Sequence, residues 1–279
     1  MSPLLQLYLI TFAALLIFAW FLQLLGWLRS LGRRIGDALC RAPLLDLVLF
    51  YFTALPIIIG AVLQGWTGLA VSLFAQLTAL LLWMALHELT HPNARRGPRI
   101  YRTLNGIVGT AANILGVCWT AWAVPTLWMV RITQYCVYPM LTWTVRFPKY
   151  KQSEWVNLSR QKFTGLIGYD LIWCLFCDWM TGVWSLGSDM LRNVESFWCP
   201  IRFYEGKKCD NCVGDFPDID NGWVAADGTM QDVTKILGDK YKKGDKVHPW
   251  YGHATRLTAE GNVPKTSEEM DSQPGHDVH

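Results

Sequence analysis

The chain has 279 residues, of which 52% are hydrophobic and 17% are charged, and its formal net charge is only +3. This composition excludes an intrinsically disordered chain, which is poor in apolar residues, and a nucleic-acid-binding chain, which needs a dense basic surface. The long apolar runs fall within residues 1–146, whereas residues 200–279 have an ordinary polar composition. The sequence therefore predicts a membrane domain followed by a small soluble region.

Three apolar runs near the start of the chain are long enough to cross a bilayer. Residues 4–27 lack the basic start of a cleavable signal peptide and are too long for one, so they predict a first span that stays in place. Residues 44–64 predict a second span, and a tight turn at residues 65–68 leads into the third, whose run from 66 to 86 carries no charge. Arginine-rich loops follow the first and third spans, so the positive-inside rule places both loops in the cytoplasm and the N-terminus outside.

The apolar stretch of residues 105–145 is interrupted by Pro125 and Arg131. It predicts either two spans with a turn near Pro125 or one span followed by an interfacial helix. The basic segment of residues 146–151 favours two spans, because a second span returns this segment to the cytoplasm.

Residues 163–186 are also apolar, but they include two acids, which are costly in a span exposed to lipid. We therefore expect an interfacial or buried helix here. One face of such a helix carries both acids and two thiols, at Asp170, Cys174, Cys177 and Asp178. This face either turns metal ligands towards a histidine site or holds two acids that are hydrogen-bonded or paired with Arg192 or Arg202.

These segments together predict an all-α polytopic membrane protein with a small, mostly irregular cytoplasmic module that bears cysteines. The expected regions are a membrane domain of about four or five spans, interfacial helices, a Cys-containing soluble module and a disordered tail, at residues 1–146, 147–198, 199–260 and 261–279. The basic loops predict a multi-pass protein of the cell inner membrane with its C-terminus in the cytoplasm.

The most specific motif is H-E-x-x-H at residues 87–91, where the third apolar run ends. Residues four apart share a helix face, so His87 and His91 can point at one metal ion. Glu88 lies where a general base for a metal-bound water would sit, which makes it the candidate catalytic residue. The competing interpretation is a polar helix end beside a basic loop, with Glu88 held by the positive charge of Arg95 and Arg96. Pro92 predicts that the helix ends at His91, because proline disfavours helical geometry in the residue before it.

Residues 87–109 resemble the first histidine box of membrane fatty-acid desaturases and carotenoid hydroxylases. In that family, H-D/E-x-x-H is followed after a short loop by an Asn and a Gly on the next helix. The matching residues here are His87, Glu88, His91, Asn105 and Gly109. The resemblance implies an oxidoreductase with two irons, but the two further histidine boxes that hold them are missing, and residues 149–157 contain no histidine.

The same motif matches that of zinc metallopeptidases. Intramembrane members that resemble the site-2 protease class also need a later aspartate in an apolar segment, and Asp170 or Asp178 occupies such a position. A membrane zinc metallopeptidase is therefore a second enzyme hypothesis, although no typical third-ligand motif is visible.

Five of the eight cysteines form two Cys-x-x-Cys pairs and one further thiol, at Cys174, Cys177, Cys199, Cys209 and Cys212. Two such pairs in one segment favour a metal site, because a reducing cytoplasm disfavours structural disulfides. Disulfides replace the metal if the topology is inverted, and free thiols are the third alternative. Tetrahedral zinc and an iron–sulfur cluster both accept such ligands, so the expected cofactor is zinc or iron.

Three functions remain open from the sequence. The first is a non-catalytic or catalytically degenerate subunit of a membrane assembly, with a Cys-ligated structural metal and with the lipid bilayer and other membrane subunits as its partners. The second is a histidine-box oxidoreductase, and the third is a zinc metallopeptidase. The incomplete ligand sets of both enzyme hypotheses favour the first function.

Overall fold

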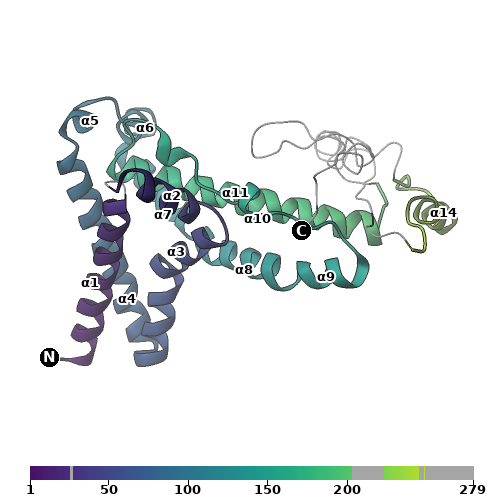
Figure 1. Cartoon of the computed structure of the whole chain (residues 1–279), viewed down its shortest axis with the longest axis horizontal. Helices are drawn as coiled ribbons and strands as arrows, with labels where there is room; N and C mark the ends of the chain where they lie inside the picture. The colour runs from purple at the N-terminus through teal and green to yellow at the C-terminus, as the bar shows by residue number, and fades with distance from the viewer. Residues whose placement is uncertain (26–27, 203–222, 245–247, 249–279) are drawn as a thin grey trace. The chain divides into compact units, whose positions relative to one another are not determined.

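The computed structural model describes residues 1–25, 28–202, 223–244 and 248 of the chain. The regular elements within these residues are helices, accompanied by two isolated β-bridges, as an all-α prediction requires. Figure 1 shows the helices with the labels used below. The chain forms two compact units, of which the first combines Met1–Trp122 with Val156–Thr181 and the second combines Ala123–Trp155 with Gly182–His279.

The first unit contains a bundle of apolar helices, α1 (Pro3–Leu25), α3 (Leu44–Phe52) and α4 (Ala54–Thr90). Helix α4 folds back on itself, because Gln64 and Gly65 leave helical geometry and Gly65 has a φ of 61°, which glycine adopts without strain. Gly60 and Gly68 then lie against each other, and a Cβ added to Gly68 would be 2.0 Å from the Gly60 carbonyl oxygen. The turn predicted between the second and third spans is therefore present, whereas the run predicted as the second span, residues 44–64, is divided between α3 and α4.

Polar side chains join the helices of this bundle. Helices α3 and α4 are separated at Thr53, where the Gln76 amide donates to the carbonyl oxygens of Phe52 and Thr53, each at 2.7 Å. The Tyr51 hydroxyl donates to the carbonyl oxygen of Ala14 on α1 at 2.9 Å. The two bonds from Gln76 supply a donor to carbonyl groups at the break between α3 and α4, where the regular helical bonding is interrupted.

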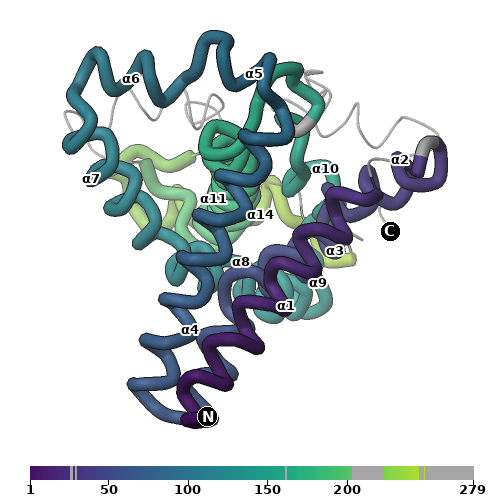
Figure 2. The backbone as a smooth tube through the Cα atoms, turned by 90° about the vertical axis from the view of Figure 1, so that its left-hand side faces the viewer, coloured from purple at the N-terminus to yellow at the C-terminus, as the bar shows by residue number. Residues whose placement is uncertain are grey.

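Short polar helices lie at the end of the bundle that is remote from the N-terminus. They are α2 (Arg29–Leu39), α5 (Pro92–Arg96) and α6 (Ile100–Val108), and Figures 1 and 2 both place them at this end. Helix α4 ends at Thr90 and Pro92 begins α5, as the proline predicts. The two arginine-rich loops that follow α1 and α4 thus lie at the same end of the bundle.

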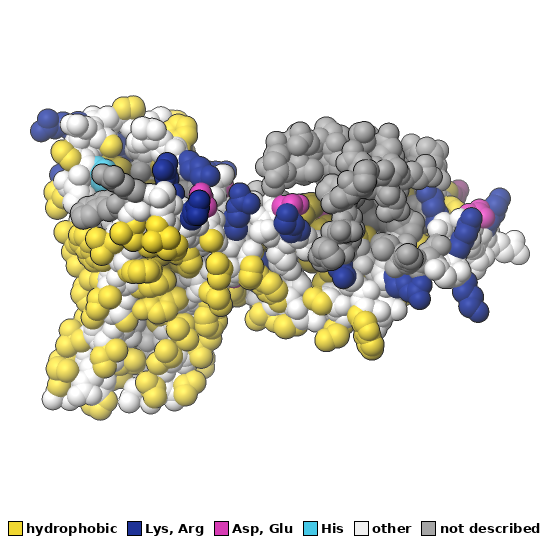
Figure 3. Space-filling model, in the orientation of Figure 1, with side chains coloured by type: hydrophobic (Ala, Val, Ile, Leu, Met, Phe, Trp, Pro, Cys, Tyr) yellow, Lys and Arg dark blue, Asp and Glu magenta, His cyan; other side chains and the backbone are white. Residues whose placement is uncertain are grey.

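Three helical segments in the described part of the chain are long and apolar enough to cross a membrane: Pro3–Leu25, Ala54–Thr90 and Thr110–Val145. At most 17% of the residues in their most apolar stretches are buried, so their apolar side chains mainly face outwards. Figure 3 shows this apolar surface over the bundle of α1, α3 and α4. Soluble monomers rarely expose so large an apolar surface, which supports the predicted membrane protein.

The third of these segments contains α7 (Thr110–Ala121), α8 (Ala123–Cys136) and α9 (Tyr138–Val145). Trp122 lies between α7 and α8 and keeps right-handed helical geometry, with a φ of −65° and a ψ of −12°. Arg131 is 1% exposed, and its guanidinium donates to the Tyr135 hydroxyl at 2.8 Å and to the Gln152 side chain at 2.7 Å. Polar partners of this kind allow a charged side chain to remain in an apolar segment.

Helix α11 (Gly168–Trp198) covers most of the stretch predicted as an interfacial or buried helix, and α10 (Gln152–Trp155) and the 3-10 helix η1 (Arg160–Lys162) precede it. Three of its large apolar side chains, Trp179, Val183 and Leu186, are buried. Helix α11 contributes to both units, which change over after Thr181.

Aromatic rings pack together in the second unit, which also contains α14 (Met230–Lys240). The ring centroids of Phe147 and Phe197 are 5.2 Å apart, and the ring of His248 stacks on Phe197 at 5.4 Å. Within the predicted cysteine module, an isolated parallel β-bridge pairs Ile201 with Val224. Most of that module, including Cys209 and Cys212, and the predicted tail lie outside the described residues.

Candidate functional site

The H-E-x-x-H motif occupies the last turn of α4. Three aromatic rings stack in a row along one face of the helix. The ring centroids of Trp83 and His87 are 4.7 Å apart, and those of His87 and His91 are 4.5 Å apart. His91 is the residue at which α4 ends, with a φ of −123° and a ψ of 63°. The two rings therefore share a face, as the i, i+4 spacing predicts.

Hydrogen bonds to the main chain engage one nitrogen of each imidazole. The Nδ1 atom of His91 lies 2.9 Å from the carbonyl oxygen of His87 and 3.1 Å from the Thr90 hydroxyl. The Nδ1 atom of His87 accepts a hydrogen bond from the backbone N–H of Gly168 at 3.2 Å, where α11 begins. Only the two Nε2 atoms are left as metal ligands, and the His87 contact ties the end of α4 to α11.

A buried arginine holds Glu88. The Nη2 atom of Arg99 donates to the Glu88 carboxylate at 2.7 Å, and its Nε atom donates to the Asp170 carboxylate at 2.7 Å. The Arg99 side chain is 0% exposed, and Nη2 also donates to the Ile167 carbonyl at 3.1 Å. Burial alone would lower the pKa of Arg99, but the hydrogen bonds and charges of the two carboxylates outweigh it and raise this pKa. We call Glu88, Arg99 and Asp170 the Arg99 clasp.

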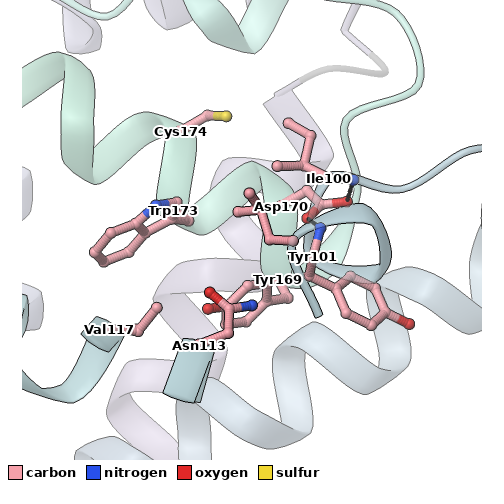
Figure 4. Close-up of a pocket in the computed structure, with 9 residues that line it drawn as sticks. Ile100, Tyr101, Asn113, Val117, Tyr169, Asp170, Trp173 and Cys174 are labelled. Carbon is pink, nitrogen blue, oxygen red and sulfur yellow. Dashed lines mark hydrogen bonds between the residues drawn. The ribbon is translucent and has the colours of Figure 1, made fainter. Parts of the chain in front are cut away.

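Asp170 also caps the N-terminus of helix α6. Its carboxylate oxygens accept hydrogen bonds from the backbone N–H groups of Ile100 at 3.2 Å and Tyr101 at 3.1 Å, which are the first two residues of α6. Figure 4 shows Asp170 beside these two residues. A carboxylate satisfies the unpaired donors of a helix N-terminus and complements its positive dipole end. The clasp therefore joins α4, α6 and α11 at one guanidinium.

The competing interpretation of Glu88 predicted an arginine partner for it, and the structure corrects the identity of that partner. Arg95 and Arg96 were the expected partners, but Arg99 holds Glu88. The partners expected for the acids of α11 also differ. Asp170 pairs with Arg99, and Asp178 pairs with Arg160 at 2.9 Å, in place of Arg192 and Arg202. Both acids find partners that lie earlier in the chain than α11 itself.

The arrangement does not fit the metal centre that the family resemblance implies. The carboxylates of Glu88 and Asp170 bind a guanidinium, so a metal ion there would have to displace a buried cation. No group of three or more His, Cys, Asp or Glu side chains gathers closely enough to hold a metal among the residues that the structure describes. The remaining two residues of the histidine-box resemblance, Asn105 and Gly109, lie at the turn between α6 and α7. The Asn105 side chain accepts a hydrogen bond from Asn113 at 2.8 Å, and Gly109, with a φ of 87°, ends α6.

The cysteines predicted as metal ligands are distributed over the chain. Cys174 and Cys177 are half-buried free thiols on α11 in the first unit, and Cys199 is an exposed free thiol in the second unit. Burial raises the pKa of the Cys174 and Cys177 thiols, while the positive charge of Arg160 acts in the opposite direction. Cys209 and Cys212 lie outside the described residues, so a Cys-ligated metal stays a prediction.

A small pocket opens beside the clasp, between α6, α7 and the start of α11. Its lining combines apolar and aromatic side chains with Asn113, Asp170 and Cys174, as Figure 4 shows. The carboxylate of Asp170 is already bound by Arg99 and by the α6 backbone. The pocket therefore offers no carboxylate that is ready to act as an acid or a base.

Comparisons of the chain with protein-family models, with curated proteins and with solved structures find no match. The resemblance to histidine-box desaturases and hydroxylases therefore stays a prediction from the sequence. Arg99 is the one central residue of the site that sequence reasoning missed. The signal that was available is the pair of acids in an apolar stretch, since each needs a cation nearby.

Proposed function

We propose that this chain is a non-catalytic subunit of a membrane assembly, in which the H-E-x-x-H motif fastens helices together at the membrane boundary. The observation that carries the proposal is the Arg99 clasp, since it engages the Glu88 carboxylate that either enzyme hypothesis requires. A general base must reach the proton that it abstracts, and Glu88 is instead held by a buried cation at 2.7 Å.

The proposed assembly surface is helix α7. Neither α6 nor α7 contains a buried residue, although α7 begins one of the three segments that are apolar enough to cross a membrane. Ile114 and Trp119 on α7 are 54% and 74% exposed. Helices in lipid associate through close packing, and small residues such as Gly116 let a second helix approach. A helix of another subunit would supply the packing that α7 lacks within this chain.

The proposal extends to location. The chain crosses the cell inner membrane several times, with the arginine-rich end of the bundle and the C-terminus in the cytoplasm. A cysteine placed at Ser272, in a variant without exposed native thiols, tests this topology. It should stay unlabelled when intact cells receive a maleimide that cannot cross membranes. Labelling from outside would overturn the topology and, with it, the argument for a cytoplasmic metal.

The role of the motif is tested by comparing Glu88→Gln with Glu154→Gln, which removes a more exposed carboxylate that pairs with Lys151 at 2.8 Å. A structural clasp predicts that only Glu88→Gln lowers the melting temperature of the solubilised protein. His87→Ala should leave the amount of bound metal unchanged. A protein that keeps its stability in Glu88→Gln but loses iron or zinc in His87→Ala would favour an enzyme, and this proposal would be wrong.

The assembly surface is tested with Gly116→Trp on α7. A Cβ at this position meets nothing within 4 Å, so the added side chain starts in open space and not against another part of the described chain. The control is Ile17→Trp on α1, where the side chain is 69% exposed and faces lipid. In native electrophoresis of membrane extracts, Gly116→Trp should reduce the size of the complex and Ile17→Trp should not. An unchanged complex in both variants would remove α7 as the assembly surface.

The structural metal remains part of the proposal on the strength of the cysteine spacing alone. Loss of one thiolate ligand removes most of the folding energy of a structural site. Cys209→Ser and Cys212→Ser should therefore release zinc or iron and expose the soluble segment to proteases. Cys118→Ser, an exposed thiol on α7, is the matched control. Equal metal content in all three variants would mean that these cysteines bind none.

A further inference from the structure

Helix α2 has two chemically different faces. Successive residues turn by about 100° around a helix, which puts Leu31, Ile35 and Leu39 on one side, Arg33 on the opposite side and Arg34 on the flank between them. The apolar side chains therefore share one face of α2, and both arginines lie outside that face. A short helix with this pattern is typical of a segment that lies in the plane of a membrane surface.

The position of α2 matches this pattern. It follows α1 directly, and a Cβ added to Gly32 would be 1.8 Å from the Leu25 carbonyl oxygen, so the backbone of α2 lies tightly against the end of α1. Leu28 and Leu31 are 51% and 61% exposed at this point. Figure 3 shows Lys and Arg side chains at the α2 end of the bundle, above the apolar surface of its helices. Helix α2 thus lies where an apolar span meets water.

The charges of this segment have no counterpart in the described part of the chain. Residues 29–41 contain four arginines and one acid, a net charge of three positive, which equals the formal net charge of the whole chain. Arg33, Arg34 and Arg41 are exposed, and none of them pairs with an acid among the described residues. The single acid, Asp37, lies 3.6 Å from Lys162 and is engaged there. Exposed arginines without partners attract anions.

We propose that α2 lies in the membrane–water interface and binds the headgroups of anionic phospholipids through Arg33 and Arg34. The guanidinium group presents paired donors that fit phosphate oxygens, and the apolar face of α2 extends between the acyl chains beneath. A free phosphate ion would use the arginines but leave Leu28 and Leu31 uncovered. The proposal goes beyond the subunit function, and it rests only on the membrane location that both share.

The purified full-length chain in nanodiscs tests the proposal. Competition between phosphatidylglycerol and phosphatidylcholine for the protein is read by native mass spectrometry as the number of each lipid retained. The test variant is Arg33→Gln with Arg34→Gln, and the control is Lys235→Gln with Lys243→Gln, which removes the same charge from exposed positions elsewhere. Each basic side chain at an anionic surface contributes roughly five-fold in affinity, so the preference of the wild type for phosphatidylglycerol should fall about 25-fold in the test variant.

The expected result is a preference that the control variant keeps and that Arg33→Lys with Arg34→Lys largely restores. Circular dichroism and size-exclusion chromatography should show all three variants folded, because the exchanged side chains are exposed. A wild type without preference would overturn the proposal, and an acidic protein partner would then have to account for the arginines. An equal loss in the test and control variants would also overturn it, since net charge alone would explain the binding.

Discussion

Replacement of Arg99 by methionine removes the guanidinium of the clasp and keeps an unbranched side chain in its place. The Asp170 and Glu88 side chains, 4% and 22% exposed, are then left without their cation. Breaking a buried ion pair from one side costs about 3–5 kcal/mol, because the remaining charge stays buried without compensation. Asp170 keeps its hydrogen bonds from the N–H groups of Ile100 and Tyr101, so we expect a loss of about 3 kcal/mol, at the lower end of this range.

The free energy of unfolding can be measured by titrating the solubilised protein with a denaturing detergent and following the fluorescence of its 15 tryptophans. The comparison variant combines Arg99→Met with Glu88→Gln and Asp170→Asn, which leaves no charge in the clasp. It should recover much of the lost stability, because neutral groups are buried at lower cost than ions. A loss below about 1 kcal/mol for Arg99→Met would refute the reasoning, since it would show that water reaches both carboxylates. A neutral triple variant no more stable than Arg99→Met would refute it as well.

Three further predictions concern other parts of the chain. Gly68→Ala should lower the free energy of unfolding by about 1–3 kcal/mol in the same titration, because the added Cβ would lie 2.0 Å from the carbonyl oxygen of Gly60. The control is Gly106→Ala, which should not destabilise the protein, because a Cβ there has no neighbour within 4 Å. Similar values for the two variants would contradict the close packing of the α4 hairpin. A water-soluble maleimide should modify the exposed Cys199 faster than Cys174 near neutral pH. Raising the pH should increase the rate at which Cys174 is modified, since burial raises the pKa of that thiol and keeps it protonated. A modification rate of Cys174 that does not change with pH would contradict the raised pKa of this thiol. Hydrogen bonds from Thr229 lower the pKa of Asp232, so its contribution to the start of α14 is complete above the ordinary carboxyl pKa of 3.8 and is lost as the pH falls through the lowered value. Hydrogen exchange at the first amides of α14 should accelerate over that window, and Asp232→Asn should remove the dependence.

The sequence was a good guide to features that are set by neighbouring residues. The turn at Gly65 and the end of α4 before Pro92 follow from the backbone preferences of glycine and proline, which act within one or two residues. The apolar stretch of residues 163–186 likewise predicted a helix, and α11 covers most of it. Each of these inferences needs no knowledge of what packs against the segment.

The partners of the acids could not be predicted in the same way. Asp170 meets Arg99 across 71 residues, and nothing in the local sequence distinguishes Arg99 from the other arginines of the same loop. The H-E-x-x-H motif shows the same limit. Its spacing correctly places both imidazoles on one face, but whether Glu88 is available to a metal-bound water depends on a side chain that the spacing does not describe. Chemistry inferred from a short motif therefore depends on its tertiary partners.

The cap that Asp170 provides for α6 also constrains how the chain is made. Its two hydrogen-bond partners precede it by 69 and 70 residues. A ribosome adds about 5–20 residues per second, so roughly 4–14 seconds of synthesis separate α6 from the residue that completes its N-terminus. During that interval the first N–H groups of α6 lack the Asp170 carboxylate, and Arg99 lacks one of its two acidic partners. This end of the first unit thus reaches its final form only after α11 has begun to emerge, and a chain truncated before α11 would present it incomplete to the quality-control machinery of the cell.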